Sequence, residues 1–374
     1  MKKVTKISLI AAACLVLAGL LLVLFSVTFL HAQVQEIWNS GMLNVSFVGV
    51  GPRSGYQELD GAYETDNSYF VSTQDIQNID LKWISGAVTV TVTDDGDAAF
   101  FETSGDTITE KTALRYGVKG TTLYIQYCAK NAPGNLPMKD LELRLPRALM
   151  KRLGDFSFDG SSAALTVSGL SAEHFSFFSA SGNLNAEGMT VGSANLDSTS
   201  GSISFSGAFC RANADSVSGE IRIESLGAAE SVSAGTTSGS IAVSGDCGEV
   251  TVSTVSGKIS SFGRVSAARL SIDSVSGAAN LSGAFEAVEA DTTSGNVEIS
   301  SDLCPREINV DTTSGDVKLF LPRSSDFELD YDTVSGKLQC AFEVSMENGR
   351  FICGSGAARF SVDTTSGDLE LGMI

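Results

Sequence analysis

The chain of 374 residues is 43% hydrophobic and holds 38 glycines but only 6 prolines. This composition favours a turn-rich β structure over a disordered chain. The net charge of −19 is concentrated in residues 155–374, where 29 residues are acidic and 11 are basic. Such a surface repels phosphate backbones, which argues against nucleic acid as a partner and favours cations or cationic groups.

The N-terminus predicts a membrane anchor. Residues 1–6 form a basic tip, because Lys2, Lys3 and Lys6 precede an uncharged run at 7–30. As a helix, at about 1.5 Å per residue, that run would be roughly 36 Å long and would cross a bilayer. The lysines favour a cytoplasmic N-terminus, so we expect a single-pass protein of the cell membrane with an extracytoplasmic C-terminal domain.

Two alternatives to the anchor stay open. A cleavable signal peptide would have a shorter apolar core of about 7–15 residues. A lipoprotein cleavage site at Cys14, after "AAA", is opposed by the mostly apolar residues that follow it.

The region between the anchor and the repeats divides in two. Residues 31–75 are mixed and polar and predict a stalk or irregular lead-in. Residues 76–160 contain short alternating stretches such as "IDLKWISGAVTVTV", which predict a small β cap and the first irregular coils. "LELRLP", ending at Pro146, is echoed by "VKLFLP", ending at Pro322. We expect these two segments to have similar roles near the two ends of the repeat domain.

A Ser-Gly pair recurs from residue 161 to residue 374. Its glycines are 18–21 residues apart, except for a last step of 31, which predicts an insertion near 341–358. A fixed period near 19 residues is the signature of stacked repeats. The ten predicted corner glycines are Gly182, Gly201, Gly219, Gly239, Gly257, Gly277, Gly295, Gly315, Gly336 and Gly367.

Alternation around each corner glycine indicates strands. Apolar residues occupy the positions seven and five before the glycine, with a polar residue between them, and the positions two and four after it, where only Ser261 interrupts. Because the inward side changes parity at the corner, glycine is expected there for its access to φ > 0.

A rung of 19 residues cannot bury its own apolar face. The rungs are therefore expected to stack at about 4.8 Å with mainly parallel pairing, which would place Val297 directly beside Val317. The predicted fold class is an all-β solenoid that follows one N-terminal transmembrane helix.

Hydroxyl and carboxyl columns accompany the corner. Ser or Thr stands three residues before every glycine and Ser one before it, where the hydroxyls can cap the corner or bond along the stack. Asp often stands four before. Asp273, Asp291 and Asp311 are weak candidates for binding a cation such as Ca²⁺, and an Asx-type turn is the alternative. No cofactor is predicted.

The seven cysteines contain no CxxC pair, and the only histidines are His31 and His174, so a zinc site has few ligands. We interpret the cysteines as small buried hydrophobes. Cys210 and Cys247 should lie two rungs apart, roughly 9–10 Å, which exceeds disulfide reach of about 7 Å. Cys340 and Cys353, on either side of "MENGR", are the one plausible pair.

Residues 76–374 resemble the bacterial putative-adhesin β-strand-repeat family, a domain family of unknown function. The resemblance is carried by "IDLKWISGAVTVTV", "LELRLP", the Thr-Thr-Ser-Gly-Asp repeats and the closing "GSGAARFSVDTTSGDLEL". It implies a surface or envelope protein with a β-solenoid, often tethered by an N-terminal membrane helix, and it brings no catalytic residues.

Three functions remain as hypotheses. The first is a non-catalytic adhesin or envelope-interaction scaffold, which binds a surface protein or a wall polymer. The second is an accessory protein of envelope-stress signalling. The third, a carbohydrate-active enzyme, is disfavoured because Trp38 and Trp83 precede the repeats and no GxSxG, HExxH or phosphate-loop motif is present. The sequence makes no prediction about the ligand, the handedness of the solenoid, the oligomeric state or the type of cell envelope.

Overall fold

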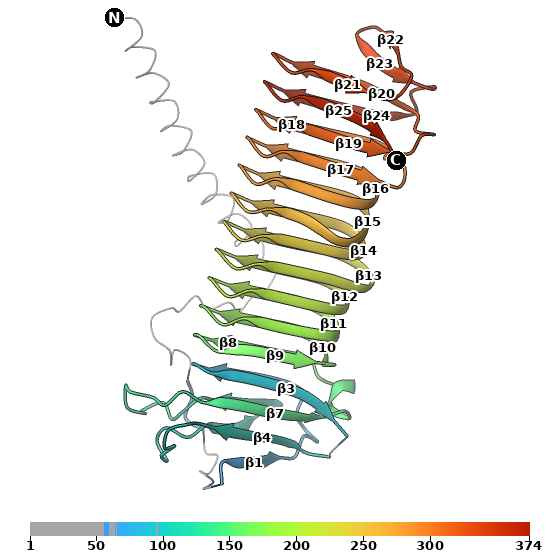
Figure 1. Cartoon of the computed structure of the whole chain (residues 1–374). Helices are drawn as coiled ribbons and strands as arrows, with labels where there is room; N and C mark the ends of the chain where they lie inside the picture. Colours follow the sequence, from blue (N-terminus) through green and yellow to red (C-terminus); the bar gives the residue numbers. More distant parts are fainter. Residues whose placement is uncertain (1–55, 60–63, 65, 95) are drawn as a thin grey trace, which may run out of the picture. The chain divides into compact units, whose positions relative to one another are not determined.

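The computed structural model describes residues 56–59, 64, 66–94 and 96–374 as a stack of strands (Figure 1). The predicted basic tip, the anchor at 7–30 and most of the lead-in lie outside these residues. Within the described part, no helix is long and apolar enough to cross a membrane.

The strands before the regular repeats are short. They are β1 (Ser68–Val71), β2 (Asn78–Trp83), β3 (Ala87–Thr93), β4 (Ala98–Thr103), β5 (Arg115–Lys119), β6 (Thr122–Gln126), β7 (Asp140–Pro146), β8 (Asp155–Gly160), β9 (Ala164–Ser168) and β10 (Ser171–Ser179). One 3-10 helix, η1 (Leu149–Lys151), lies between β7 and β8.

The regular repeats form long strands that run from one corner to the next. They are β11 (Leu184–Ser198), β12 (Ile203–Ser216), β13 (Ile221–Thr236), β14 (Ile241–Thr254), β15 (Ile259–Ser274) and β16 (Ala279–Thr292). The strands that follow are β17 (Val297–Ser301), β18 (Glu307–Thr312), β19 (Val317–Leu321), β20 (Phe327–Thr333), β21 (Leu338–Cys340), β22 (Ser345–Glu347), β23 (Arg350–Cys353), β24 (Ala358–Thr364) and β25 (Leu369–Met373).

Each rung contributes one strand segment before its corner and one after it. The segments before the corner pair with one another and form the first ladder, in the order β5-β6-β2-β8-β10 through β16, then β18-β24-β20-β23-β22. The segments after it form the second ladder, β1-β4-β7-β3-β9, then β11 through β17, then β19-β25-β21. Val297 pairs with Val317 in this ladder. The predicted all-β, mainly parallel stack is therefore confirmed.

The last two rungs are not stacked in chain order. β24 pairs with β18 on one side and with β20 on the other, and β25 lies between β19 and β21. The rung of Gly367 is thus inserted between those of Gly315 and Gly336, whereas a simple repeat would add its copies in sequence. The predicted insertion near 341–358 carries the β22–β23 hairpin and returns the chain by one rung (Figure 1).

The first rung is inserted in the same way. β2 lies between β6 and β8, and β3 lies between β7 and β9. The chain therefore skips a rung at two points. After β7 it crosses the rung of β2 and β3, and after β19 it crosses the rung that β24 and β25 form. These are the points where "LELRLP" and "VKLFLP" end, so the two echoed segments do have the same role. Proline, which cannot donate to a ladder, suits a position where the strand must leave its sheet.

The apolar columns form one continuous core between the two ladders. Its N-terminal part is aromatic: the rings of Phe158 and Phe177, on adjacent rungs, are stacked with centroids 5.5 Å apart. In the middle of the stack Val, Ile, Leu and Ala fill the same inward positions, all of them buried. Since each rung covers the inward side chains of the next, the core extends along the stack.

The core begins earlier than expected. Tyr56 and Tyr69 are buried, and β1 pairs with β4 in antiparallel orientation. Residues 56–59 and 68–71, which the sequence assigned to a stalk, thus belong to the N-terminal cap. Their polar neighbours hide the signal, because only a few apolar residues occur in this stretch.

The corner glycines have a different role from the one expected. None of the ten has a φ in the left-handed region. A Cβ atom added to Gly315 would instead lie 2.0 Å from the carbonyl oxygen of Gly295, and the same close approach recurs at every corner. Glycine is therefore required because neighbouring rungs pack backbone against backbone.

Hydroxyl groups hold each corner to its own rung and to the next. At nine of the ten corners the glycine N–H donates to the Ser or Thr hydroxyl three residues earlier, as from Gly315 to Thr312 at 3.0 Å. The Ser before the glycine donates to a carbonyl of the adjacent rung, as Ser314 does to Thr293 at 3.3 Å. Both predicted uses of these hydroxyls are confirmed.

Candidate functional site: a row of aspartates on the first ladder

The most regular chemical feature of the outer surface is a line of carboxylates. Strand alternation points the residue four before each glycine away from the core, and the parallel register places successive copies side by side. Asp273, Asp291, Asp311, Asp363 and Asp332 are consecutive register partners, and all are exposed. We call these five residues the Asp row. Asp197 and Asp215 form a separate pair nearer the N-terminus.

Crowding of like charges changes the acidity of this row. The pKa of Asp291 is raised, first by partial loss of hydration and then by the charges of Asp273 and Asp311. The pKa of Asp363 is raised by the same two causes, with Asp311 and Asp332 as its charged neighbours. Because like charges at rung spacing repel, the row is a strained concentration of negative charge that a cationic partner would relieve.

The separate pair of Asp197 and Asp215 allows a test of how burial and like charge affect stability. Its pKa is raised to about 6, first by burial and then by Asp215. A carboxyl whose pKa is higher in the folded state favours folding when protonated, and this contribution is lost as the pH rises through about 6. Asp197→Asn should therefore raise the unfolding temperature at pH 7 and weaken its pH dependence between pH 4 and 7, as thermal unfolding will show. A lower unfolding temperature at pH 7 would contradict the assignment.

The Asp row contains the three candidate cation ligands predicted from the sequence. Asp273, Asp291 and Asp311, the weak candidates for cation binding, do lie on adjacent rungs. Among the residues that the structure describes, however, no three His, Cys, Asp or Glu side chains are grouped closely enough to hold a metal ion. Cation binding by these three aspartates stays a prediction.

The Asx-type turn, the alternative interpretation of these aspartates, is wrong. It would need the N–H two residues after the Asp, and that group donates elsewhere. The N–H of Thr313, for example, donates to the carbonyl of Thr292 on the adjacent rung at 3.2 Å. The rung-to-rung ladder thus takes the donor, which leaves the carboxylates free to face solvent.

His174 lies on the outer face of the first ladder, between register partners on the two adjacent rungs. Its Nδ1 lies 2.8 Å from the hydroxyl of Ser193 on the next rung, and Asp155 is its register partner on the other side. A Ser–His pair can be a nucleophile and a base. Here it is exposed on a regular sheet whose backbone N–H groups are taken up by the parallel pairing, so no donor set is built around it for an oxyanion.

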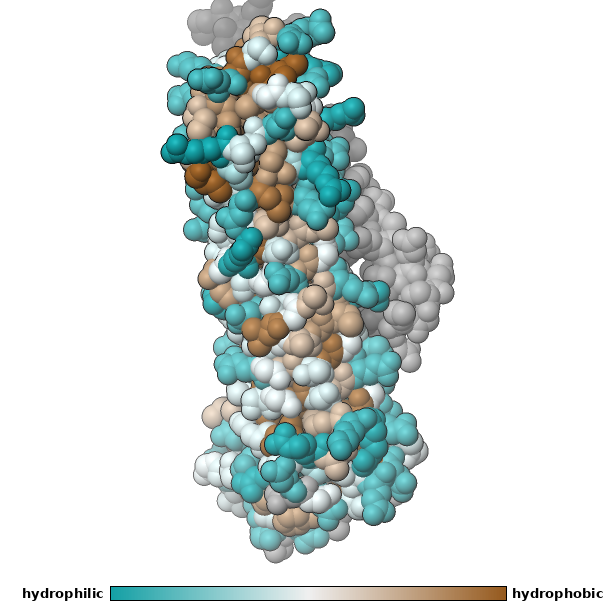
Figure 2. Space-filling model, turned by 90° about the vertical axis from the view of Figure 1, so that its right-hand side faces the viewer, coloured by the Kyte–Doolittle hydropathy of each residue, from teal (hydrophilic) through white to brown (hydrophobic). Residues whose placement is uncertain are grey.

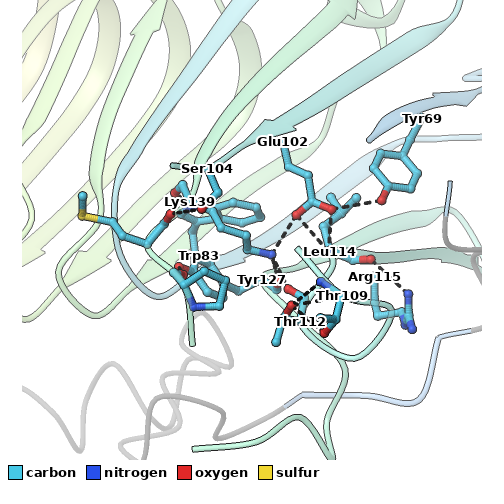
Figure 3. A network of polar contacts seen from close by, with 12 residues as sticks. Tyr69, Trp83, Glu102, Ser104, Thr109, Thr112, Leu114, Arg115, Tyr127 and Lys139 are labelled. Atoms are coloured by element: carbon cyan, nitrogen blue, oxygen red, sulfur yellow. Dashed lines mark hydrogen bonds and ion pairs between the residues drawn. The ribbon is translucent and has the colours of Figure 1, made fainter. Parts of the chain in front are cut away.

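The N-terminal cap contains a buried ion pair that the sequence did not predict (Figure 3). Lys139 Nζ lies 2.7 Å from Glu102 Oε2, and both side chains are 0% exposed. The ammonium also donates to the carbonyls of Thr112, at 2.6 Å, and Tyr127. Burial lowers the pKa of Lys139, and the nearby Glu102 carboxylate partly offsets this.

The carboxylate of the pair is held equally fully. The Tyr69 hydroxyl donates to Glu102 Oε1 at 3.0 Å, and the Leu114 N–H donates to both oxygens. Lys139 also lies over the Tyr127 ring, 4.3 Å from its centroid. With every partner inside the protein and no exposed surface, this cluster fastens β4 to the segments around it and is not a substrate site. Neither residue is marked in the sequence, where each is one charge among many.

Cys340 and Cys353 are both free thiols, so the proposed bridge between them is not formed. Cys353 donates instead to the carbonyl of Ser325 at 3.3 Å, and Cys340 to that of Phe342. Burial raises the pKa of both thiols. Cys210, however, is exposed, so the interpretation of the cysteines as small buried hydrophobes is wrong for that residue.

The closing motif contains one further carboxylate contact. Asp326, just before β20, accepts bonds from the N–H groups of Ser355 and Ala357, each at 2.9 Å, and from the Ser355 hydroxyl at 2.7 Å. Gly354 and Gly356, with φ of +69° and +73°, fold the turn around this carboxylate. The turn thereby fixes the start of β24 beside β20.

Asp326 should therefore confer sensitivity to strong acid. These bonds lower the pKa of Asp326 to about 2. A depressed carboxyl pKa stabilises the fold above the unfolded value near 4 and ceases to do so as the pH falls through about 2. Asp326→Asn should reduce stability at pH 7 and remove part of the acid transition between pH 4 and 2, measured by denaturant unfolding. Equal acid transitions in both proteins would count against this role.

The side of the stack drawn in Figure 2 has a mixed surface. On the side turned toward the viewer in Figure 2, hydrophobic residues are scattered between hydrophilic ones, with more of them toward the end that carries β22 and β23. Val344 and Phe351 are partly buried there, and Met346 is 66% exposed.

Most of the chain matches the model of a known protein family. The family model Toastrack DUF4097 matches residues 73–265 and 245–372. No curated protein matches the chain. Solved structures described as a putative adhesin from Parabacteroides distasonis and one from Bacteroides fragilis are each 13% identical, with TM-scores of 0.32 and 0.30. The former comparison covers 81% of this chain and 95% of the other, and the latter 82% and 96%.

A third solved structure, described as a putative cell adhesion protein from Clostridium sporogenes, is 9% identical with a TM-score of 0.18, and the comparison covers 82% of this chain and 99% of that one.

Proposed function

Because the chain belongs to the Toastrack DUF4097 family, we propose that it is a membrane-tethered, extracytoplasmic β stack that binds an envelope or surface partner without catalysis. The observation that carries the proposal is the Asp row, a straight, exposed line of carboxylates over five adjacent rungs. At about 4.8 Å per rung, it spans roughly 19 Å.

The charge of the chain supports a cationic partner. Of the net charge of −19, nearly all lies in the half that forms the repeats. Ion pairs are present on the first ladder, as between Arg269 and Glu289 at 3.6 Å, but the five residues of the Asp row are in none of the described ion pairs. Such a surface speeds association with a partner of opposite charge, and salt weakens the effect.

The membrane tether is supported by the uncharged run at 7–30 after three lysines. Fractionation of cells that express the full chain tests it: the protein should stay in the membrane pellet after washing with alkaline carbonate. Protease added to intact cells, or to cells with a permeabilised outer layer, should cleave the repeat domain. Release by carbonate, or protection of the repeats while the membrane is intact, would refute the tether or its orientation.

The binding proposal is tested with the residues of the Asp row. The full chain in detergent is offered to cells, wall polymers and matrix proteins at low salt, with and without Ca²⁺. Replacing all five aspartates of the row with asparagine should reduce binding at least tenfold, because it removes five charges from an exposed surface. A matched control neutralises five exposed acids outside the face of the Asp row: Glu187, Glu220, Asp246, Asp302 and Glu343.

If neither the unmodified chain nor the control binds any of these surfaces, adhesion is refuted. If the two variants lose binding equally, net charge is responsible and the row is not a site. A pull-down that returns a membrane sensor protein instead of a surface ligand would replace adhesion with the hypothesis of an envelope-stress accessory. Glycan turnover that disappears with one carboxylate pair would establish an enzyme.

A further inference from the structure

The segment 354–374, which we call the closing rung, is enclosed on both sides. Its strand β24 pairs with all six residues of β18 and with all seven of β20, and β25 pairs with β19 and β21. Figure 1 shows β24 and β25 within the stack, not at its end. The rungs on either side are both formed by residues that precede 354 in the sequence. They therefore leave a slot that the closing rung fills.

The slot is apolar inside. Val310 and Val317 line one side of it and Leu329 lines the other, and all three are buried with the closing rung in place between them. Leu338, in the outermost strand of the second ladder, is already partly exposed. Until the closing rung inserts, these side chains face water, so during folding the slot is a strong acceptor for a strand pair of the right sequence.

Polar contacts select the sequence that fits. The N–H of Asp368 donates to the carboxylate of Asp316 at 3.0 Å, and the N–H of Lys337 donates to that of Asp368 at 2.8 Å. Lys318 pairs with Glu370 at 3.5 Å. These contacts join the closing rung to the rungs on both sides of the slot. A segment identical in sequence to the closing rung would therefore form them best.

The closing rung is joined to the preceding hairpin by a short turn. Gly354 and Gly356 adopt positive φ, and the turn is held from outside by the single side chain of Asp326. Positive-φ glycines can change direction at little steric cost. A different path of this turn would carry the closing rung away from its own stack without changing any other rung.

We propose that the slot of one copy accepts the closing rung of a second copy, so that two chains exchange residues 354–374 reciprocally. The exchanged dimer keeps every ladder pairing of the monomer, and only the path of the turn at 354–357 differs. The free-energy difference between the two forms is therefore set by that turn and by protein concentration, as is general for domain swapping. The partner is a second copy of this chain, and this self-association is independent of the proposed surface ligand.

The test uses two single variants of the full chain in detergent, Lys318→Cys and Glu370→Cys, each with Cys210→Ser because Cys210 is exposed. Positions 318 and 370 are register partners, at a separation that a disulfide can bridge. The two variants are unfolded together, refolded at concentrations from micromolar to millimolar, and oxidised mildly. A disulfide between the two positions then joins two different chains. Mass spectrometry of the digest should find that linked peptide in a yield that rises with concentration.

Two controls distinguish exchange from chance contact. Glu298→Cys replaces Lys318→Cys in the first, because position 298 is two rungs from 370, about 9–10 Å, beyond the reach of a disulfide. In the second, the original variants are folded separately and mixed only afterwards, which should give no linked peptide. A yield for 318–370 no higher than that of 298–370 at any concentration would overturn the proposal.

A variant that fails to refold leaves the question to the unmodified chain. Refolded over the same range of concentrations, it should give a dimer that light scattering detects and that persists after dilution. A monomer mass at every concentration would overturn the proposal equally.

Discussion

Replacing Gly315 with alanine is expected to destabilise the repeat domain by about 4–5 kcal/mol or to prevent its folding. The added Cβ would lie 2.0 Å from the backbone oxygen of Gly295 and 3.1 Å from the Thr312 hydroxyl. Neither the backbone of the adjacent rung nor the capping hydroxyl can move without breaking the corner bonds. Equilibrium unfolding in denaturant, followed by circular dichroism, measures the change.

Gly227→Ala is the matched control. Gly227 also lies in the repeats, without positive φ, but a Cβ there would meet only Ala208, at ordinary contact distances of 3.5 Å and 3.8 Å. Its effect should be below about 1 kcal/mol. If both variants cost the same, or if Gly315→Ala is tolerated, close packing of the corners is not the reason for the repeated glycine.

The second large effect is expected at Lys139. Lys139→Met removes one partner of a fully buried ion pair and leaves Glu102 without its countercharge. Breaking such a pair typically costs about 3–5 kcal/mol, because the remaining charge stays out of water. Denaturant unfolding should show this loss in the N-terminal cap, which near-ultraviolet circular dichroism of Trp83 and Tyr127 follows directly, since both rings contact Lys139.

The double variant Lys139→Met/Glu102→Gln gives the control. A neutral amide still accepts the bond from Tyr69 and needs no countercharge, so the double variant should be more stable than Lys139→Met alone. The coupling energy of the cycle should be about 1–3 kcal/mol. A double variant that is less stable than the single one by the full cost of Glu102→Gln would mean that the two side chains act independently.

The repeats could be predicted from the sequence because one physical cause acts ten times. The inward columns, the strand register at Val297 and Val317, and the use of Thr312 and Ser314 at the corner all follow from alternation around a fixed glycine. The reason for that glycine was wrong, since the sequence shows that a side chain is absent but not whether φ or a neighbouring backbone excludes it.

The order of the rungs at the two ends could not be predicted. Nearly identical segments such as 310–319 and 362–371 have the same pattern of inward and outward residues, and that pattern does not show which neighbour each one takes. The similar segments "LELRLP" and "VKLFLP" do end where the chain skips a rung. Only the order of the strands, however, shows that this is their shared role. The Lys139–Glu102 pair was missed for a related reason: residues far apart in the sequence meet in an irregular cap that no period describes.

The stacking order of the rungs underlies both the length of the Asp row and the slot of the closing rung. Disulfide formation at exposed positions of the full chain tests it most directly. The pair Asp311→Cys/Asp363→Cys should form an intramolecular bridge, because these residues are register partners at about 4.8 Å, whereas Asp311→Cys/Asp332→Cys should not, because two rungs separate them. A bridge between 311 and 332, with none between 311 and 363, would mean that the rungs stack in chain order and would contradict this structure.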